Sequence, residues 1–214
     1  IRPAAAKNSV LPLLAATLLC RTPSRLRAVP PLADVATSLA LLQSVGAKAE
    51  RQGSDLFVAP GQDLQGEIPD YLAGAMRSSV FYLAPLLCRV GYVRLPLPGG
   101  CRLGPRPVDI HLAGLAAMGA EVELEGIAVT LRRTGPLHGV DFTLRLPSVG
   151  ATMTLLMAAC CAAGQTVLRG AAQEPEIGDM IAFLSACGAD IQGAGTPVLT
   201  VQGGRPLGGA FHRP

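Results

Sequence analysis

The sequence predicts an α+β fold in which three copies of one unit surround buried helices. Two observations support this prediction. A short segment centred on a Gly-Ala pair, called the Gly-Ala phrase below, occurs three times, and two helix-like runs accompany each copy. The glycines of the phrase are Gly46, Gly119 and Gly188, which are about 70 residues apart. That period is too long for an ordinary solenoid. It favours one domain, residues 1–214, with three pseudo-symmetric units.

Each copy of the phrase ends a helix and enters a strand. A run rich in leucine and alanine leads to the glycine, and a segment of alternating polarity follows it, as in Leu115-Ala-Ala-Met-Gly119-Ala-Glu-Val-Glu123. A glycine directly after a helix ends it readily, because glycine adopts the left-handed backbone conformation without strain. We therefore predict that all three glycines cap helices.

Two kinds of helix are predicted in each unit. Runs that are apolar all round should form buried helices, and amphipathic runs should lie outside them. The buried helices are expected at about 9–20, 77–89 and 150–163, and the amphipathic ones at about 34–46, 107–119 and 176–188. Pro12 suits the first turn of the first buried helix, whereas Pro85 should kink the second helix or make it start late.

Small sheets should complete each unit. Strands are predicted at 26–29, 55–58, 91–96, 120–124, 127–132, 140–146, 165–169 and 198–202. Each unit then has the order strand–helix–strand–strand–helix, up to a circular shift.

Composition limits the function classes. Half of the 214 residues are hydrophobic and 15% are charged, so a sizeable aliphatic core can form. The net charge of +3, without a basic run interleaved with aromatics, predicts no nucleic-acid partner.

The apolar run from Ser9 to Cys20 resembles a signal peptide but is too short to cross a bilayer. Because similar runs occur twice more, we interpret it as a buried helix and expect no membrane partner.

The six cysteines form no Cys-x-x-Cys pair and lie near no histidine cluster, so we predict no metal site and no cofactor. Five lie in apolar, helix-like stretches, where a free cysteine behaves as a small hydrophobic residue. This distribution suits a reducing cytoplasm better than a secreted disulfide scaffold. The exception is Cys101.

Cys101 lies in a loop rich in glycine and proline, residues 97–107, together with Arg102 and Arg106. Nearby cations lower the pKa of a thiol, and the thiolate is its reactive form. A helix is expected to start at Pro107, and free N–H groups at a helix start attract anions. These residues alone leave two interpretations open: a site for an anionic, phosphorylated substrate, or a tight turn with an incidental cysteine.

The loop segment Pro98-Gly-Gly-Cys-Arg-Leu-Gly-Pro-Arg-Pro-Val-Asp-Ile-His111 resembles the active-site loop of the UDP-N-acetylglucosamine enolpyruvyl transferases. Four further stretches match that family in the same order: Ala6-Lys-Asn-Ser-Val-Leu-Pro12, Met76-Arg-Ser-Ser79, Pro147-Ser-Val-Gly-Ala-Thr152 and Glu174-Pro-Glu-Ile177. The resemblance implies an inverse α/β barrel, or prism, of three βαβαββ units. Family members have two such domains, so the chain resembles the first, and the second is an expected partner.

The resemblance also implies a reaction. The enolpyruvyl group of phosphoenolpyruvate passes to the 3′-hydroxyl of UDP-N-acetylglucosamine, and phosphate leaves, in the first committed step of peptidoglycan synthesis. Cys101 matches the cysteine that protonates the substrate and can form a covalent adduct. Lys7, Asn8 and Arg106 match residues that contact phosphoenolpyruvate. Lys7 could instead be a solvated lysine, and Asn8 could cap the first helix.

The contacts implied for the UDP-sugar are more numerous: Arg77, Arg106, Pro107, Val108, Asp109, Ile110, His111, Leu146, Pro147, Ser148 and Val149. Arg77 could instead be a rim charge, and Ser148 a helix N-cap. Arg145 could replace a lysine that the family often has near Leu146. His138 and His212 match no role and are expected to be exposed.

Four residues depart from the family pattern: Ala6, Arg102, Pro105 and Gln173. They could mark a diverged paralogue. The sister class, the shikimate-phosphate enolpyruvyl transferases, shares the fold but lacks the loop cysteine. A third alternative is a non-catalytic module that only binds the UDP-sugar.

Overall fold

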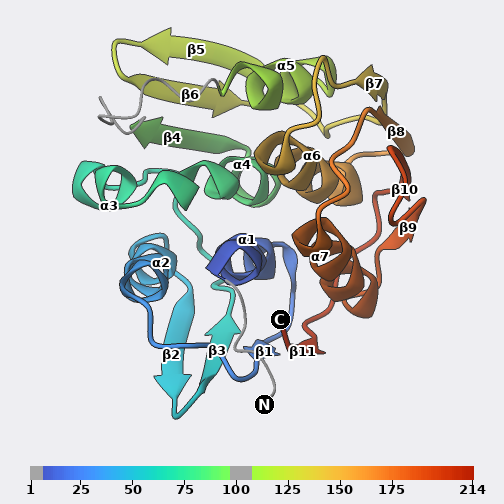
Figure 1. Cartoon of the computed structure of the whole chain (residues 1–214). Coiled ribbons are helices and arrows are strands. Elements are labelled where there is room, and N and C mark those ends of the chain that lie inside the picture. Colours follow the sequence, from blue (N-terminus) through green and yellow to red (C-terminus); the bar gives the residue numbers. More distant parts are fainter. Residues whose placement is uncertain (1–6, 97–107) are drawn as a thin grey trace.

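Three small sheets lie around the outside of the molecule and helices fill its centre (Figure 1). The computed structural model describes residues 7–96 and 108–214. The inner helices are α1 (Lys7–Ala16), α4 (Leu83–Val90) and α6 (Val149–Cys161), and the outer ones are α2 (Ala33–Ser44), α5 (Asp109–Ala117) and α7 (Pro175–Ala186). Shorter helical segments are η1 (Thr17–Leu19), α3 (Asp70–Ala75) and η2 (Arg77–Tyr82). The α+β class and both kinds of helix are confirmed.

The strands form three sheets with one shared plan. Their orders are β11-β1-β3-β2, β4-β6-β5 and β7-β8-β10-β9. The bounds are β1 (Ser24–Leu26), β2 (Lys48–Gln52), β3 (Asp55–Ala59), β4 (Tyr92–Pro96), β5 (Glu121–Glu125), β6 (Ala128–Arg132), β7 (Asp141–Thr143), β8 (Gln165–Arg169), β9 (Asp190–Gln192), β10 (Val198–Gln202) and β11 (Phe211–His212). In each sheet, the first strand of a unit pairs antiparallel with that unit's hairpin.

One parallel contact per sheet links neighbouring units. β11 runs parallel to β1, and β7 runs parallel to β8. In the second sheet a parallel bridge between Glu67 and Arg94 takes the place of that strand. Each of these segments follows the hairpin of one unit and joins the sheet of the next. The three units are therefore interlocked.

The predicted helix caps are confirmed in all three units. Gly46, Gly119 and Gly188 have φ angles of 95°, 101° and 104°. The alanine after each glycine donates its N–H to a leucine carbonyl one turn back, at 2.9, 3.0 and 3.0 Å. This is the Schellman hydrogen bond, which satisfies a carbonyl at the helix end. The next chain segment enters each strand directly, as predicted.

Burial follows the predicted helix types. Ten consecutive residues of α6, Ala151–Cys160, are buried, so no side of this helix reaches solvent. The core is almost entirely aliphatic, and the Tyr82 hydroxyl within it lies 2.6 Å from Ser38 Oγ. Among the described residues, no helix is long and apolar enough to cross a membrane.

The two prolines of the inner helices differ from each other. Pro85 lies in the first turn of α4, because the 3₁₀ segment η2 precedes it, so the predicted late start is confirmed. Pro12 lies beyond the first turn, because α1 already includes Lys7. The expectation for Pro12 was wrong, and α1 tolerates a proline at a position that removes one helical hydrogen bond.

Two further expectations were wrong. The first strand ends at Leu26 rather than at residue 29, because Ala28 has a φ of 55° and donates its N–H to Asp55 Oδ1. His212 is not exposed: its Nε2 lies 2.7 Å from Asp179 Oδ1, and its ring packs edge-on against Phe183. His138 is exposed, as expected.

A glycine lies at each point where the chain enters the next unit. A Cβ added at Gly66, Gly139 or Gly209 would overlap the backbone carbonyl oxygen of Tyr92, Gln165 or Pro23, respectively. These three glycines let two backbones approach closely, and any side chain would force them apart.

We expect Gly139→Ala to lower the free energy of unfolding by about 1–3 kcal/mol, because its Cβ has no space. Gly178→Ala is the matched control, since a Cβ at that exposed position in α7 meets nothing within 4 Å. Alanine in a helix should leave stability unchanged or raise it by about 0.5–1 kcal/mol. Urea denaturation measures both, and equal stability of the two variants would contradict the close approach.

Candidate functional site

The predicted site residues within the described ranges are in or next to the first turns of four helices. Asn8 is the second residue of α1, and Arg77 is the first of η2. Asp109, Ile110 and His111 open α5, and Val149 opens α6. The shared topology makes the inner helices parallel, so their first turns lie at one end of the molecule.

The N-terminal ends of the inner helices carry partial positive charge, which makes this end of the molecule favourable for an anion. The first turns of α1, η2, α4 and α6 contain no acidic residue within the described ranges. Each outer helix, by contrast, has an acid in its first turn: Asp34, Asp109 and Glu176. A carboxylate there offsets the partial positive charge of a helix N-terminus. The inner helices keep that charge available for a ligand.

An ion pair joins the two segments that were predicted to bind the UDP-sugar. The Arg145 guanidinium, just before α6, pairs with the Asp109 carboxylate at the start of α5. Both side chains are about half exposed. Arg145 was predicted to lie near the segment Leu146–Val149. The ion pair shows that it also contacts the segment at the start of α5.

Ser148 is the N-cap of α6, because its Oγ accepts the N–H of Ala151 at 3.3 Å. The capping interpretation of Ser148 is thus confirmed, which leaves a second, ligand-binding role as a prediction. Leu146 and Pro147 precede it and are exposed.

At the start of α5, Val108 precedes the helix and Ile110 is buried. The backbone of residues 108–110 is therefore better placed than the Ile110 side chain to meet a ligand.

His111 is buried, with 6% of its surface exposed. Neither ring nitrogen lies in hydrogen-bonding geometry with any described residue. Burial lowers the pKa of His111 to about 4, although the charge of Asp109 and the nearby Val108 backbone oppose this shift. The ring faces the start of α6, since a Cβ added at Gly150 would lie 2.9 Å from Nε2. This contact could not be inferred from the sequence, because a glycine inside a helix has many possible roles.

The remaining predicted residues are only partly described. Asn8 and Arg77 are both exposed, and η2 packs against α1 and α6, so their elements are neighbours. Cys101, Arg106 and Pro107 lie outside the described residues, as does the side chain of Lys7. Within the described ranges, no group of three His, Cys, Asp or Glu residues could hold a metal ion.

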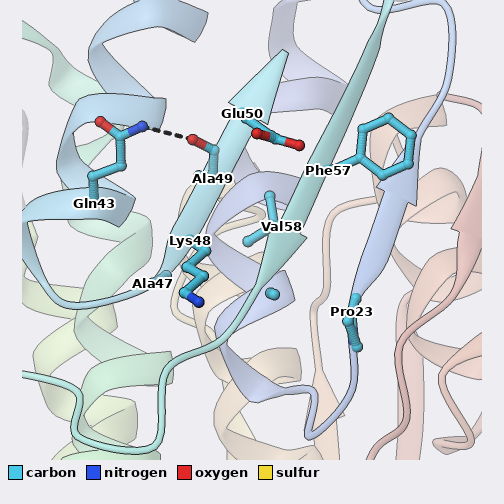
Figure 2. A pocket seen from close by; sticks show the side chains of 9 residues that line it. Pro23, Gln43, Ala47, Lys48, Ala49, Glu50, Phe57 and Val58 are labelled. Carbon is cyan, nitrogen blue, oxygen red and sulfur yellow. Dashed lines mark hydrogen bonds between the residues drawn. The ribbon is translucent and has the colours of Figure 1, made fainter. Parts of the chain in front are cut away.

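A surface hollow lies elsewhere, beside β2 and β3 of the first sheet. Figure 2 shows Lys48, Glu50 and Phe57 around it, with Gln43 donating to the Ala49 carbonyl at 2.6 Å. The described residues that line it include none of the predicted site residues. The hollow is therefore separate from the candidate site at the helix starts.

Comparison with known proteins identifies the family to which this chain is similar. A family model described as EPSP synthase (3-phosphoshikimate 1-carboxyvinyltransferase) matches residues 1–213. Two similar curated proteins are both named UDP-N-acetylglucosamine 1-carboxyvinyltransferase. The one from Cellvibrio japonicus (strain Ueda107) is 44% identical over 99% of this chain and 51% of its own length. The one from Acidiphilium cryptum (strain JF-5) is 46% identical over 97% of this chain and 50% of its own length. The chain thus spans about half the length of these relatives.

Solved structures share the fold. The enolpyruvyl transferase NikO from Streptomyces tendae has a TM-score of 0.87 at 23% identity, over 100% of this chain and 51% of its own. An EPSP synthase from Acinetobacter baumannii has a TM-score of 0.79 at 17% identity, over 100% of this chain and 48% of its own. These likenesses confirm the inverse α/β barrel. The family model, which matches nearly the whole chain, shows that the chain belongs to the EPSP synthase family of enolpyruvyl transferases.

Proposed function

We propose that this chain forms one domain of an enzyme that transfers the enolpyruvyl group of phosphoenolpyruvate to the 3′-hydroxyl of UDP-N-acetylglucosamine. The observation that carries the proposal is the 43–46% identity to proteins named for this reaction, over 97–100% of the chain. The EPSP synthase structures, at 17–18% identity, support the fold alone. The reaction would belong to peptidoglycan synthesis in the cytoplasm.

The helix starts supply the electrostatics that this reaction needs. Both substrates are anionic, and the first turns of the inner helices offer N–H groups without a competing carboxylate. Arg77, Lys7 and Arg106 would add fixed positive charge, and an arginine can hold a phosphate or carboxylate in a bidentate way. Asn8 would contact phosphoenolpyruvate at the start of α1.

The segments at the starts of α5 and α6 would hold the UDP-sugar. The ion pair of Asp109 and Arg145 links them, and neutral His111 fills the space against Gly150. Cys101 would donate the proton to C3 of the enol while the sugar hydroxyl adds to C2. The half of the family's length that this chain does not span would supply the remaining contacts.

Binding and turnover test the proposal separately. In calorimetry, UDP-N-acetylglucosamine should bind saturably and shikimate 3-phosphate should not; the reverse result would contradict the proposed substrate.

In a protein extended to the length of the relatives, Cys101→Ser should lower kcat about 100-fold or more, as expected for loss of a general acid. Sugar binding should persist. Binding without any turnover in the extended protein would favour a non-catalytic module.

We expect Arg145→Ala to weaken UDP-N-acetylglucosamine binding about tenfold, or about 1.4 kcal/mol. The substitution removes a cation and leaves the Asp109 carboxylate unpaired beside a diphosphate. Arg169→Ala is the matched control, because Arg169 forms an equally exposed pair with Asp141 that links two strands of the third sheet. Calorimetry should show unchanged affinity for the control, and equal affinity of both variants would exclude this role for Arg145.

His111 should make stability depend on pH. Its pKa is about 4 in the folded protein and 6.5 in an unfolded chain, so the unfolded state binds more protons between these values. Stability should therefore fall by about 3 kcal/mol as the pH drops from 7.5 to 3.5, and this loss should disappear in His111→Asn. Urea denaturation across the pH range measures the difference. His138→Asn, at an exposed histidine, should retain the full loss.

A further inference from the structure

The five described cysteines lie at the opposite end of the helices from the proposed active site. Cys88, Cys160 and Cys161 are in the last turns of α4 and α6, Cys20 follows η1, and Cys187 follows α7. Two of these thiols touch: Cys20 Sγ lies 3.6 Å from Cys187 Sγ. Both residues are buried, with 0% and 4% of their surfaces exposed. The proposed reaction uses neither of them.

This thiol pair lies where the first and third units close on each other. Cys20 forms a parallel bridge with Leu207, and the Cys187 carbonyl accepts the N–H of Gly208 at 2.8 Å. Beyond it, β11 pairs with β1 through only two residue pairs. The closing segment, residues 207–212, is thus held by a short ladder directly beside two sulfur atoms.

The pKa values of the two thiols are shifted in opposite directions. Contact with the Cys187 sulfur lowers the pKa of Cys20, and Ser24 and the charge of Arg89 act in the same direction against burial. The Arg89 guanidinium donates to the Cys20 carbonyl at 2.8 Å, which holds this charge nearby. The same sulfur contact, together with burial, raises the pKa of Cys187. The Arg89 guanidinium beside Cys20 favours a thiolate there, so we assign Cys20 as the nucleophile of the pair and Cys187 as the partner that resolves it.

We propose that Cys20 and Cys187 form an oxidation site at which hydrogen peroxide, admitted when the closing segment separates from β1, converts the two neighbouring thiols into a disulfide that locks this segment. The Cys20 thiolate attacks one peroxide oxygen, the O–O bond breaks, and one water leaves after protonation, which makes a sulfenic acid on Cys20. Cys187 sulfur then attacks Cys20 sulfur, the S–O bond breaks, and a second water leaves. The two thiols lose two electrons and two protons in total, and the peroxide is reduced to two waters.

The disulfide would connect residues 167 positions apart in the chain. Crosslinks that close long loops restrict the unfolded chain most, so the oxidised protein should melt at a higher temperature. It should also protect the amides of residues 207–212 from hydrogen exchange, because β11 could no longer separate from β1 without straining the crosslink.

Peptide mapping tests the proposal in Cys101→Ser protein, which lacks the loop thiol. After treatment with hydrogen peroxide under native conditions and blocking with N-ethylmaleimide, trypsin separates the cysteines. Cys20 falls in residues 8–21 and Cys187 in the peptide that begins at Gly170, whereas Cys88 falls in 78–89 and both Cys160 and Cys161 in 146–169. We expect a crosslink between the first two peptides that dithiothreitol removes.

Thermal melting of the same samples gives the second measurement. Oxidation should raise Tm by about 5 °C or more, reversibly with dithiothreitol. Cys187→Ala should abolish this rise, and Cys160→Ala, at another buried cysteine of this end, should keep it. A crosslink between 78–89 and 146–169 alone, or N-ethylmaleimide on both Cys20 and Cys187 after peroxide, would overturn the proposal. The peptide map decides the matter even if a variant does not fold.

Discussion

The three units hold together through a constraint on the backbone at the end of each outer helix. A left-handed glycine turns the chain there, and the carbonyl just before the glycine accepts an N–H from the segment that crosses to the next unit. These carbonyls belong to Val45, Met118 and Cys187, and the donors are Gln65, His138 and Gly208. Each cap therefore ends a helix and also positions the crossover.

The candidate site depends on this arrangement. Because the units repeat one topology, the inner helices are parallel and present their first turns at one end. Parallel helices that are packed together would normally be unfavourable at that end, where like partial charges meet. The inner helices carry no carboxylate there to relieve this within the described ranges, whereas the outer helices do. An anionic substrate is the group best suited to offset the accumulated charge.

The sequence predicted what depends on short-range pattern. The three capping glycines, the inner and outer helices and the late start caused by Pro85 all followed from periodicity and from residue geometry. Several of the missed features depend on long-range contacts. β11 has only two residues, so no strand pattern exists to detect, and His212 finds Asp179 only after folding. Likewise, the ion pair of Arg145 with Asp109 joins residues 36 positions apart, which spacing alone could not indicate.

The 3₁₀ segment before α4 also changes the reach of one inner helix. A 3₁₀ helix rises about 2.0 Å per residue and an α-helix about 1.5 Å, so the six residues of η2 extend about 3 Å further than six α-helical residues would. Arg77, at the tip of this segment, is carried outward by that distance. The proline that delays α4 thereby breaks the threefold symmetry of the helix starts. A pseudo-symmetric scaffold can in this way bind a molecule that has no symmetry of its own.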